Sequence, residues 1–249
     1  MTKPERRRLD QVLVERGLAE SRTRAQALIM AGLVFSSERR LDKPGTLLAA
    51  DAPLDVRGRD HPWVSRGGVK LAAALDHFGI DPQDFVCLDV GASTGGFTDV
   101  LLSRGAARVY AVDVGSAQLA WKLRSDPRVV VLERTNVRTL GPARVTEPID
   151  LVVCDVSFIS LTLALPAALA LTRPGARLAA LIKPQFEAGR AQIGKGGIVR
   201  DEAVRSEVCA RISAWLADRP GWRVLGVIES PIHGADGNIE YLLGGVRDT

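Results

Sequence analysis

Long apolar runs are missing from this chain of 249 residues, and cysteines are few. The longest apolar stretch, near residues 161–171, is too short and too interrupted to span a bilayer. The first residues, MTKPERRRLDQ, lack the apolar segment of a signal peptide. The three cysteines, Cys87, Cys154 and Cys209, are an odd and scattered set. We therefore expect free thiols in a reducing cytoplasm, and neither a zinc site nor any other bound metal.

A large excess of charge of one sign is also missing. The net charge is +4, and residues 1–60 contain 12 Lys and Arg residues against 9 Asp and Glu residues. This mild basic bias is compatible with a polyanionic partner but does not establish one. The hydrophobic content of 46% is ample for a packed core, and the length suits a main domain with a smaller one.

A small module is predicted at residues 1–60. Two short helical patterns follow each other there, carried by Leu9, Val12, Leu13, Ala25, Leu28 and Ile29. Ser21 is placed to cap the second helix, and Gly32 is placed to end it. Short strands and turns are expected after Gly32. The polar segment at 61–68 suits a linker.

Strand-like and helix-like segments alternate across residues 69–249. Strands are expected at 85–90, 108–113, 129–132, 149–155, 177–183, 222–229 and 239–246. Helices are expected at 98–104, 117–124, 161–171 and 200–217. This alternation predicts an α/β fold with a doubly wound parallel sheet of the Rossmann-like type.

The segment CLDVGASTGGFTDVLL, residues 87–102, is the most informative one. An apolar strand leads into a loop of small residues at 91–96, where glycines would let the backbone approach a ligand. The order Gly-Ala-Ser-Thr-Gly-Gly fits neither the dinucleotide spacing nor a Walker loop. It also suits S-adenosylmethionine, which has no phosphates. Asp113 would then accept hydrogen bonds from the ribose, and Asp89 would face the ammonium group. The alternative is a structural turn with an exposed Asp113.

Four ionisable residues, Lys70, Asp155, Lys183 and Glu240, stand at the ends of expected strands and helices. Lys70 is expected to open one further helix, KLAAALDHF. Asp155 and Lys183 close apolar strands, so both are expected at the carboxyl edge of the sheet, where ligands bind in this architecture. Two lysines and two carboxylates in one cleft could move a proton. Each residue alone is better explained as a surface charge.

Together these motifs resemble the TlyA family of rRNA 2′-O-methyltransferases, once described as haemolysins. Residues 8–55 resemble an α-L RNA-binding module through RLD, SRTRAQALI and AGLV. Residues 63–249 resemble an FtsJ-like catalytic domain through WVSRGGVKL, DVGASTGGFTDVLL, DLVVCDVSFISL, IKPQFE and GNIEYLL. This chain departs from the family in one segment, VFSSERR, which lacks the glycine of the family's hairpin. The family's RNA contacts in that hairpin are therefore not carried over to this chain.

The resemblance implies a small α+β RNA-binding domain at 1–60 and a class I methyltransferase domain at 69–249. It implies a catalytic tetrad of Lys70, Asp155, Lys183 and Glu240. The implied S-adenosylmethionine site comprises Asp89, Gly91, Ala92, Ser93, Thr94, Gly95, Gly96, Phe97, Asp113, Asn136 and Val137. The expected RNA contacts, which are chosen for their positive charge, are Arg6, Arg7, Arg8, Arg22, Arg24 and Arg66. On charge alone, a solvated basic surface is an equal alternative for the arginines of the small module. The implied substrate is a cytidine ribose in rRNA, in the large ribosomal subunit and in some members also in the small one.

Other classes of function remain as alternatives. A membrane-active haemolysin is disfavoured by the absence of a secretion signal and of a spanning segment. A nicotinamide-dependent oxidoreductase is disfavoured by the loop spacing, and a pseudouridine synthase would lack the segment from Asp89 to Asp113. A non-catalytic ribosome-binding factor is a further alternative, in which an intact tetrad would be unusual.

Overall fold

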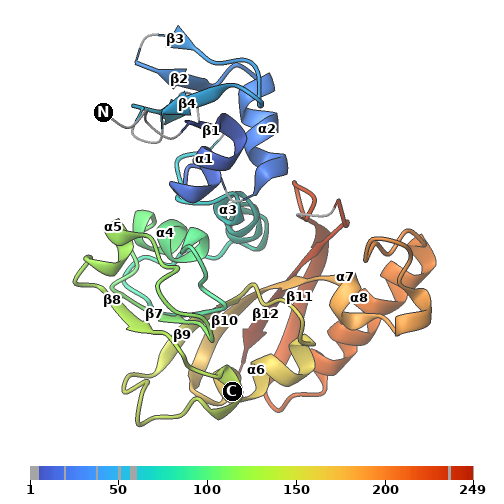
Figure 1. Ribbon diagram of the computed structural model, residues 1–249. Coiled ribbons are helices and arrows are strands. Elements are labelled where there is room, and N and C mark those ends of the chain that lie inside the picture. Colours follow the sequence, from blue (N-terminus) through green and yellow to red (C-terminus); the bar gives the residue numbers. More distant parts are fainter. Residues whose placement is uncertain are drawn as a thin grey trace. The chain divides into compact units, whose positions relative to one another are not determined.

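The computed structural model describes residues 6–19, 21–37, 39–49, 52–56, 61–234 and 237–248. The chain divides into two compact units, Met1–Pro62 and Trp63–Thr249 (Figure 1). The segment 61–68, which we predict as a linker, crosses this boundary, and its residues from Trp63 onward belong to the second unit.

The described part of the N-terminal unit contains two short helices, α1 (Leu9–Glu15) and α2 (Arg22–Met30), at the positions of the two helical patterns. The Ser21 hydroxyl accepts a hydrogen bond from the Arg24 N–H at 3.2 Å, which confirms the predicted cap. Gly32 adopts a left-handed φ of +71° directly after α2, a conformation that favours glycine and ends the helix.

Five short strands accompany these helices among the residues of this unit that the structure describes. Strand β1 (Arg6–Arg8) pairs with β4 (Leu47–Ala49). Strand β2 (Val34–Ser36) pairs with β3 (Arg39–Arg40) and with β5 (Asp55–Val56). All three pairings are antiparallel. The core of the unit is completely buried at Leu9, Leu13, Ala25, Ile29 and Val34.

The C-terminal unit is built on a seven-stranded sheet in the order β11-β12-β10-β9-β6-β7-β8. Its strands are β6 (Val86–Val90), β7 (Arg108–Val112), β8 (Val129–Leu132), β9 (Ile149–Cys154), β10 (Thr172–Ile182), β11 (Trp222–Glu229) and β12 (Tyr241–Arg247). Strands β10, β9, β6, β7 and β8 are parallel, whereas β12 runs antiparallel to both β10 and β11. The parallel part confirms the predicted Rossmann-like fold, and β12 makes the sheet mixed.

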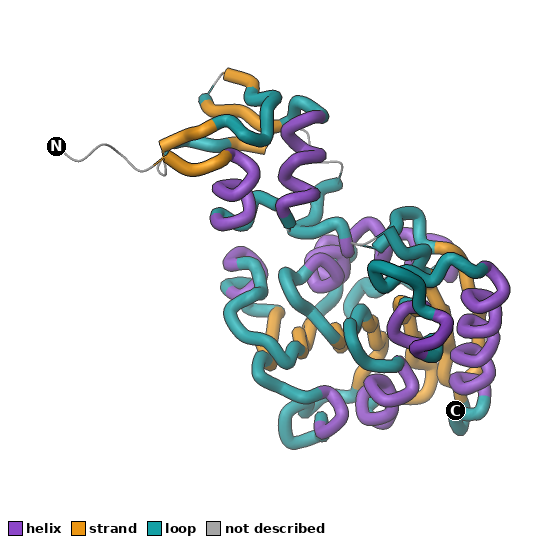
Figure 2. The backbone as a smooth tube through the Cα atoms, turned by 45° about the vertical axis from the view of Figure 1, so that its right-hand side comes forward, coloured by secondary structure: helices purple, strands orange, loops and turns teal. Residues whose placement is uncertain are grey.

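Helices cover both faces of this sheet (Figure 2). Helices α3 (Gly67–Phe78) and α4 (Gly96–Ser103) pack on one face, in a core that includes Leu71 and Leu101. Helices α6 (Leu161–Ala170) and α8 (Glu202–Ala217) pack on the other, in a core that includes Leu165 and Ile212. The shorter helices are α5 (Trp121–Arg124), α7 (Pro184–Glu187), η1 (Val137–Thr139) and η2 (Arg190–Gln192). The sheet therefore lies between two layers of helices, and the carboxyl ends of its parallel strands form the edge at which the candidate site lies.

Two predicted helix boundaries are wrong. The helix predicted at 117–124 is only the short α5, because Ala117 has a φ of +58°, which cannot belong to a right-handed helix. Helix α3 starts at Gly67, before Lys70, which we expected to open it. A Cβ built at Gly68 would lie 2.6 Å from Cγ of Trp63, so the glycine lets the tryptophan pack on this first turn.

The three cysteines carry free thiols, as expected, with Cys87 and Cys154 buried and Cys209 partly buried. Burial raises the pKa of the Cys209 thiol to about 11 and that of the other two still further. In the part of the chain that the structure describes, no helix combines the length and the apolar character needed to cross a membrane.

Candidate active site

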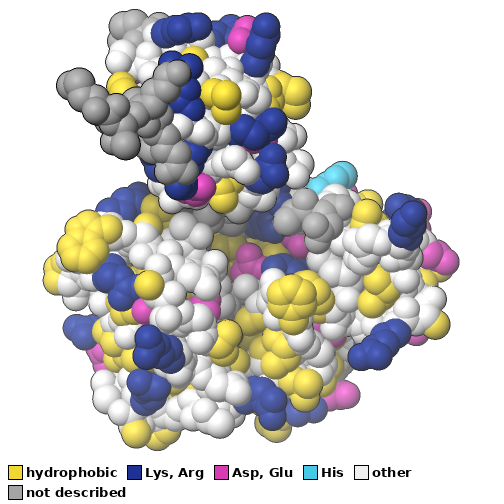
Figure 3. Space-filling view, in the orientation of Figure 1, with side chains coloured by type: hydrophobic (Ala, Val, Ile, Leu, Met, Phe, Trp, Pro, Cys, Tyr) yellow, Lys and Arg dark blue, Asp and Glu magenta, His cyan; other side chains and the backbone are white. Residues whose placement is uncertain are grey.

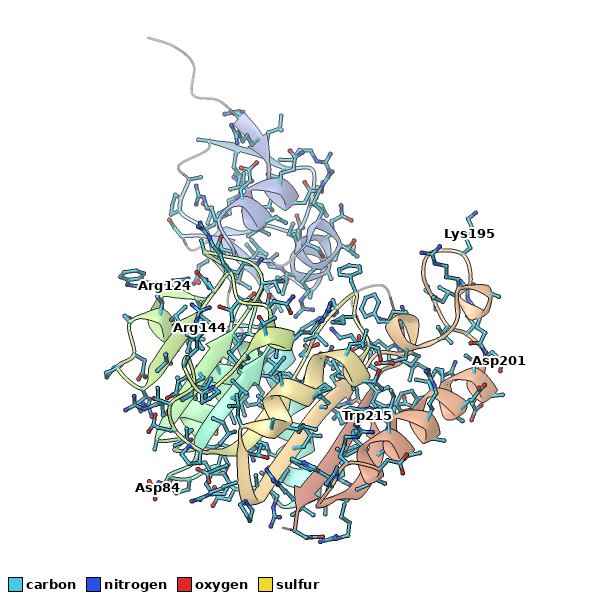
Figure 4. The ribbon with its side chains drawn as sticks, turned by 90° about the horizontal axis from the view of Figure 1, so that it is seen from below. Asp84, Arg124, Arg144, Lys195, Asp201 and Trp215 are labelled. Carbon is cyan, nitrogen blue, oxygen red and sulfur yellow. The ribbon has the colours of Figure 1, made fainter. Side chains whose placement is uncertain are left out.

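A cavity of about 320 Å³ opens where strands β6, β7 and β9 end. It is lined by Val90, Gly91, Ser93, Val112, Asp113, Val114, Gln118, Thr135, Asn136, Val137, Asp155, Val156, Ser157, Phe158 and Ile159. Arg144, which is labelled in Figure 4, donates a 2.9 Å hydrogen bond to the Thr135 hydroxyl and so braces one part of the wall. The volume lies within the range of small-molecule and cofactor sites.

The glycine loop after β6 lies against the next strand end. Gly91 has a φ of +85°, and a Cβ built there would lie 2.5 Å from the carbonyl oxygen of Asp155. Gly95 has a φ of +98°, and a Cβ there would lie 2.3 Å from Leu123. Both positions therefore require glycine, for the close approach as well as for the backbone conformation.

Asp113 follows β7 and shapes the loop at the cavity. Its carboxylate accepts hydrogen bonds from the N–H groups of Ser93, at 2.8 Å, and Gly115, at 2.7 Å. Asn136 lines the cavity and caps η1 by accepting a 3.0 Å hydrogen bond from the Arg138 N–H. Five predicted cofactor residues thus line the cavity, namely Gly91, Ser93, Asp113, Asn136 and Val137.

The other predicted cofactor residues are not among those that line the cavity but are close to them in the chain. Ala92 and Phe97 are buried in the core between the sheet and α3 and α4. The Thr94 carbonyl accepts a 3.1 Å hydrogen bond from the Ala120 N–H. A Cβ at Gly96 would lie 2.2 Å from the Ser65 hydroxyl, so this glycine packs against the start of the unit.

Asp89, on β6, is completely buried. Its Oδ2 accepts a 2.6 Å hydrogen bond from the Thr98 hydroxyl, whereas Oδ1 has no partner among the described residues. Loss of solvation, together with the nearby carboxylates of Asp155 and Asp113, raises the pKa of Asp89 to about 7, against the opposing effect of the Thr98 bond. A buried carboxylate oxygen without a partner costs free energy, so this atom points to a missing donor or cation.

The four predicted catalytic residues form two ion pairs. Nζ of Lys183 lies 2.5 Å from Oδ1 of Asp155 and 3.2 Å from the Ser157 hydroxyl. Nζ of Lys70 lies 2.5 Å from Oε2 of Glu240, and both of these side chains are buried. The two lysines thus come from different elements, one following β10 and the other on α3.

Strand register brings the two ion pairs to the same edge of the sheet. Ile182 pairs with Tyr241 in the antiparallel β10–β12 ladder. Lys183 and Glu240 are the next residues outward on the two strands, so they stand opposite each other. Asp155 follows β9, the parallel neighbour of β10. This common edge is also the one at which the cavity opens.

The predicted RNA-contacting arginines of the N-terminal unit lie on two elements. Arg6, Arg7 and Arg8 are on β1, and Arg22 and Arg24 are on α2. Nε of Arg8 and one terminal nitrogen of Arg22 contact the buried Asp10 carboxylate at 2.9 and 3.0 Å. Their hydrogen bonds, with that of Gln26, hold the pKa of Asp10 well below its usual range. Lys and Arg side chains are prominent on the face of this unit that Figure 3 shows. Arg66 belongs to the other unit, where it precedes α3.

Several residues that line the cavity were not predicted from the sequence. Gln118 and Thr135 stand in loops after strands β7 and β8. The segment Val156–Ile159 directly follows Asp155, and its position after a predicted strand end was the available signal. Phe158 is 89% exposed, has a φ of +65°, and lies 4.9 Å from the ring of Phe186 between centroids.

Residues 63–247 match the FtsJ-like methyltransferase family. The chain belongs to this family. Residues 7–52 of this FtsJ-like methyltransferase match the S4 domain. The two matches fall on the two compact units of the structure.

Relatives of this FtsJ-like methyltransferase cover almost all of its length. It is 54% identical to "Putative rRNA methyltransferase YqxC" of Bacillus subtilis (strain 168), over 95% of this chain and 84% of that protein. It is 49% identical to "16S/23S rRNA (cytidine-2'-O)-methyltransferase TlyA" of Mycobacterium tuberculosis (strain ATCC 25618 / H37Rv), over 96% of this chain and 89% of that protein. A solved structure, "Putative hemolysin from Streptococcus thermophilus", superposes with a TM-score of 0.81 at 44% identity and covers 99% of this chain and 90% of that one.

Proposed function

We propose that this protein transfers a methyl group from S-adenosylmethionine to the 2′-hydroxyl of a cytidine ribose in rRNA. The proposed substrate is the large ribosomal subunit, with the small subunit as a second candidate. The observation that carries this proposal is the meeting of two lysine–carboxylate pairs, Lys183–Asp155 and Lys70–Glu240, at the sheet edge where the cavity opens. Relatives with rRNA cytidine 2′-O-methyltransferase names support the choice of acceptor.

The residues around the cavity fit the proposed cofactor. The close approach of Gly91 to Asp155 leaves backbone, and no side chain, at the floor of the loop. The carboxylate of Asp113 stands at the cavity, where it would accept hydrogen bonds from ribose hydroxyls. The unpartnered Oδ1 of Asp89 would face the ammonium group, directly or through water. Asn136 and Val137 would lie beside the adenine.

The chemistry assigned to the tetrad is alignment and proton removal. S-adenosylmethionine supplies an activated methyl group on a sulfonium when it is bound. Lys183 would orient the ribose 2′-hydroxyl and, in its uncharged form, take its proton as the new bond forms. Asp155 would hold Lys183 by the 2.5 Å contact. Lys70, fixed by Glu240 at 2.5 Å, would hold the ribose and its phosphate in line with the methyl group.

The N-terminal unit would supply affinity for rRNA. Its arginines on β1 and α2 offer donors for phosphate oxygens, and structured RNA is recognised mainly through shape, phosphates and 2′-hydroxyls. To present a 2′-hydroxyl to Lys183, the enzyme would unstack the target nucleotide, at a cost of about a few kcal/mol that phosphate contacts would offset.

The decisive experiment is methylation of separated ribosomal subunits with labelled cofactor, followed by mapping of the labelled ribose. We expect label on a cytidine 2′-oxygen of the large subunit, and none with the Lys183→Ala variant. Label in the small subunit as well would extend the substrate range. No label in either subunit, by a protein that binds S-adenosylhomocysteine, would contradict the proposal.

A further inference from the structure

One short segment makes a whole wall of the cavity and also contacts Lys183. Residues 155–159, between β9 and α6, contribute Asp155, Val156, Ser157, Phe158 and Ile159 to the lining. Lys183 contacts Asp155 and Ser157 from the end of β10. Because this wall is a loop, its position depends on what holds its far end.

Glu187 holds that far end. It is the last residue of α7 and is only 8% exposed. Its Oε1 accepts a 2.7 Å hydrogen bond from the Leu161 N–H, and its Oε2 accepts one of 2.7 Å from the Ser160 hydroxyl. Ser160 is the N-cap of α6, so the carboxylate is bound where the loop becomes a helix. An anion at a helix N-terminus is additionally favoured by the helix dipole.

The helix that carries Glu187 is itself anchored on both sides. Lys183 immediately precedes α7 and is its N-cap residue. Arg211, on α8, donates a 2.7 Å hydrogen bond to the Glu187 carbonyl. The Phe186 ring packs at 4.9 Å, between centroids, against that of Phe158 in the loop. Glu187 thus links the segment that carries Lys183 to the segment that carries Asp155.

We propose that Glu187 is a positioning residue of the methyltransferase, which fixes the Asp155–Ile159 wall against Lys183. This role rests on the proposed function, because Lys183 and Asp155 are its proposed catalytic pair. Glu187 is not among the residues that line the cavity, and its carboxylate binds Ser160 and Leu161 and not Lys183 or Asp155. It therefore acts through Ser160 and Leu161. Displacing a reacting group by about 1 Å can lower a rate about a hundredfold.

Asp150 provides a matched control. It is also a buried carboxylate, 6% exposed, and its Oδ2 accepts a 2.8 Å hydrogen bond from the Val86 N–H. It also forms an ion pair with Arg173. Asp150 stands at the start of β9, whereas Asp155 follows the end of that strand. Asp150→Ala therefore removes similar interactions at the opposite edge of the sheet.

The experiment compares Glu187→Ala, Glu187→Gln and Asp150→Ala in the full chain, at a temperature where each variant is folded. Methyl transfer to ribosomal subunits gives kcat and KM, and calorimetry gives the affinity for S-adenosylhomocysteine. Glutamine retains an acceptor for the Leu161 N–H and a polar partner for Ser160. We expect Glu187→Ala to lower kcat at least about tenfold, with KM for the subunit changed less than about threefold. We expect Glu187→Gln and Asp150→Ala to retain kcat within about threefold.

Equal losses of kcat in Glu187→Ala and Asp150→Ala would overturn the positioning role, as would a Glu187→Gln variant as impaired as Glu187→Ala. If the unmodified protein methylates neither subunit, the proposed function fails and affinity for S-adenosylhomocysteine decides the role of Glu187. We then expect Glu187→Ala alone to weaken this affinity, by about tenfold, because the cavity wall has moved. Unchanged affinity in that case would overturn the inference.

Discussion

Lys70 and Glu240 form a buried ion pair with a contact of 2.5 Å, although 170 residues separate them in the chain. Their side chains are only 7% and 3% exposed. Lys70 comes from α3 and Glu240 immediately precedes β12, so the pair joins the first helix of the C-terminal unit to its last strand. Two desolvated charges at this position are costly to maintain for stability alone.

Removing one partner of this pair should destabilise the protein strongly. We expect Glu240→Ala to lower the free energy of unfolding by about 3–5 kcal/mol, because Lys70 would remain buried without its counter-ion. The double variant Lys70→Met with Glu240→Leu should recover most of that loss and still transfer no methyl group. Urea unfolding and a methylation assay measure the two effects. A double variant with full activity would show that the pair is purely structural.

Replacing Lys183 should separate chemistry from cofactor binding. We expect Lys183→Ala to abolish methyl transfer and to leave the thermal shift with S-adenosylhomocysteine largely unchanged, because Lys183 does not line the cavity. The control is Arg223→Ala, which removes an exposed cation of β11 that pairs with Asp248. Near-normal turnover by Lys183→Ala would make the assignment of the proton acceptor wrong.

The strand ends could be predicted because apolar runs stop there. Asp113, Asp155 and Lys183 each follow such a run, and the strands end within one residue of the predicted places. Parallel strands place their carboxyl ends at one edge, so the meeting of these residues followed from the fold.

Contacts between distant segments could not be predicted in the same way. The bonds from Glu187 to Ser160 and Leu161 depend on side-chain packing at the ends of α7 and α6, which no local pattern encodes. The start of α3 was missed because Gly67 and Gly68 are poor helix formers. The packing of Trp63 on Gly68 explains the second glycine, and this contact is visible only in the structure.

The raised pKa of Asp89, about 7, predicts a pH-dependent affinity for the cofactor product. Only the ionised carboxylate can pair with an ammonium group, so we expect S-adenosylhomocysteine to bind more tightly as the pH rises from 6 to 8. Calorimetry at three pH values measures this change. The Asp89→Asn variant should bind weakly and without this dependence, and an equally flat profile for the unmodified protein would contradict the assignment.

The same shift predicts the direction of a stability change. The pKa of Asp89 is raised in the folded state from its ordinary value of 3.8, so its neutral form favours folding. Its contribution is complete below about pH 4 and is lost as the pH rises to about 7. Asp89→Asn should therefore remove one component of the decline in stability between these pH values, measured by urea unfolding without ligand.

Gly91 should tolerate no side chain. A Cβ there would lie 2.5 Å from the Asp155 carbonyl oxygen, so Gly91→Ala must shift the backbone that carries Asp155. We expect a loss of affinity for S-adenosylhomocysteine of at least about tenfold, together with lower stability from the strained φ of +85°. Gly141→Ala is the control, because a Cβ at Gly141 would meet no atom within 4 Å. Equal affinities of Gly91→Ala and Gly141→Ala for S-adenosylhomocysteine would show that the close approach of Gly91 to Asp155 is not required for binding.

The arginines of α2 should contribute to rRNA affinity through phosphates. We expect Arg22→Ala to weaken binding to ribosomal subunits and to reduce the slope of log affinity against log salt by about 0.7–0.9, the effect of one lost phosphate contact. Asp10 would keep its contacts with Arg8 and Gln26, so the fold of the unit should persist. Affinity for S-adenosylhomocysteine should not change.

The control for this prediction is again Arg223→Ala, which removes one positive charge from the other unit. Long-range attraction depends on net charge, so both variants should slow association to a similar extent. Only the loss of a direct phosphate contact changes the number of counter-ions released on binding. If Arg22→Ala and Arg223→Ala have the same salt slope as the unmodified protein, Arg22 contacts no phosphate, and rRNA must bind through other residues.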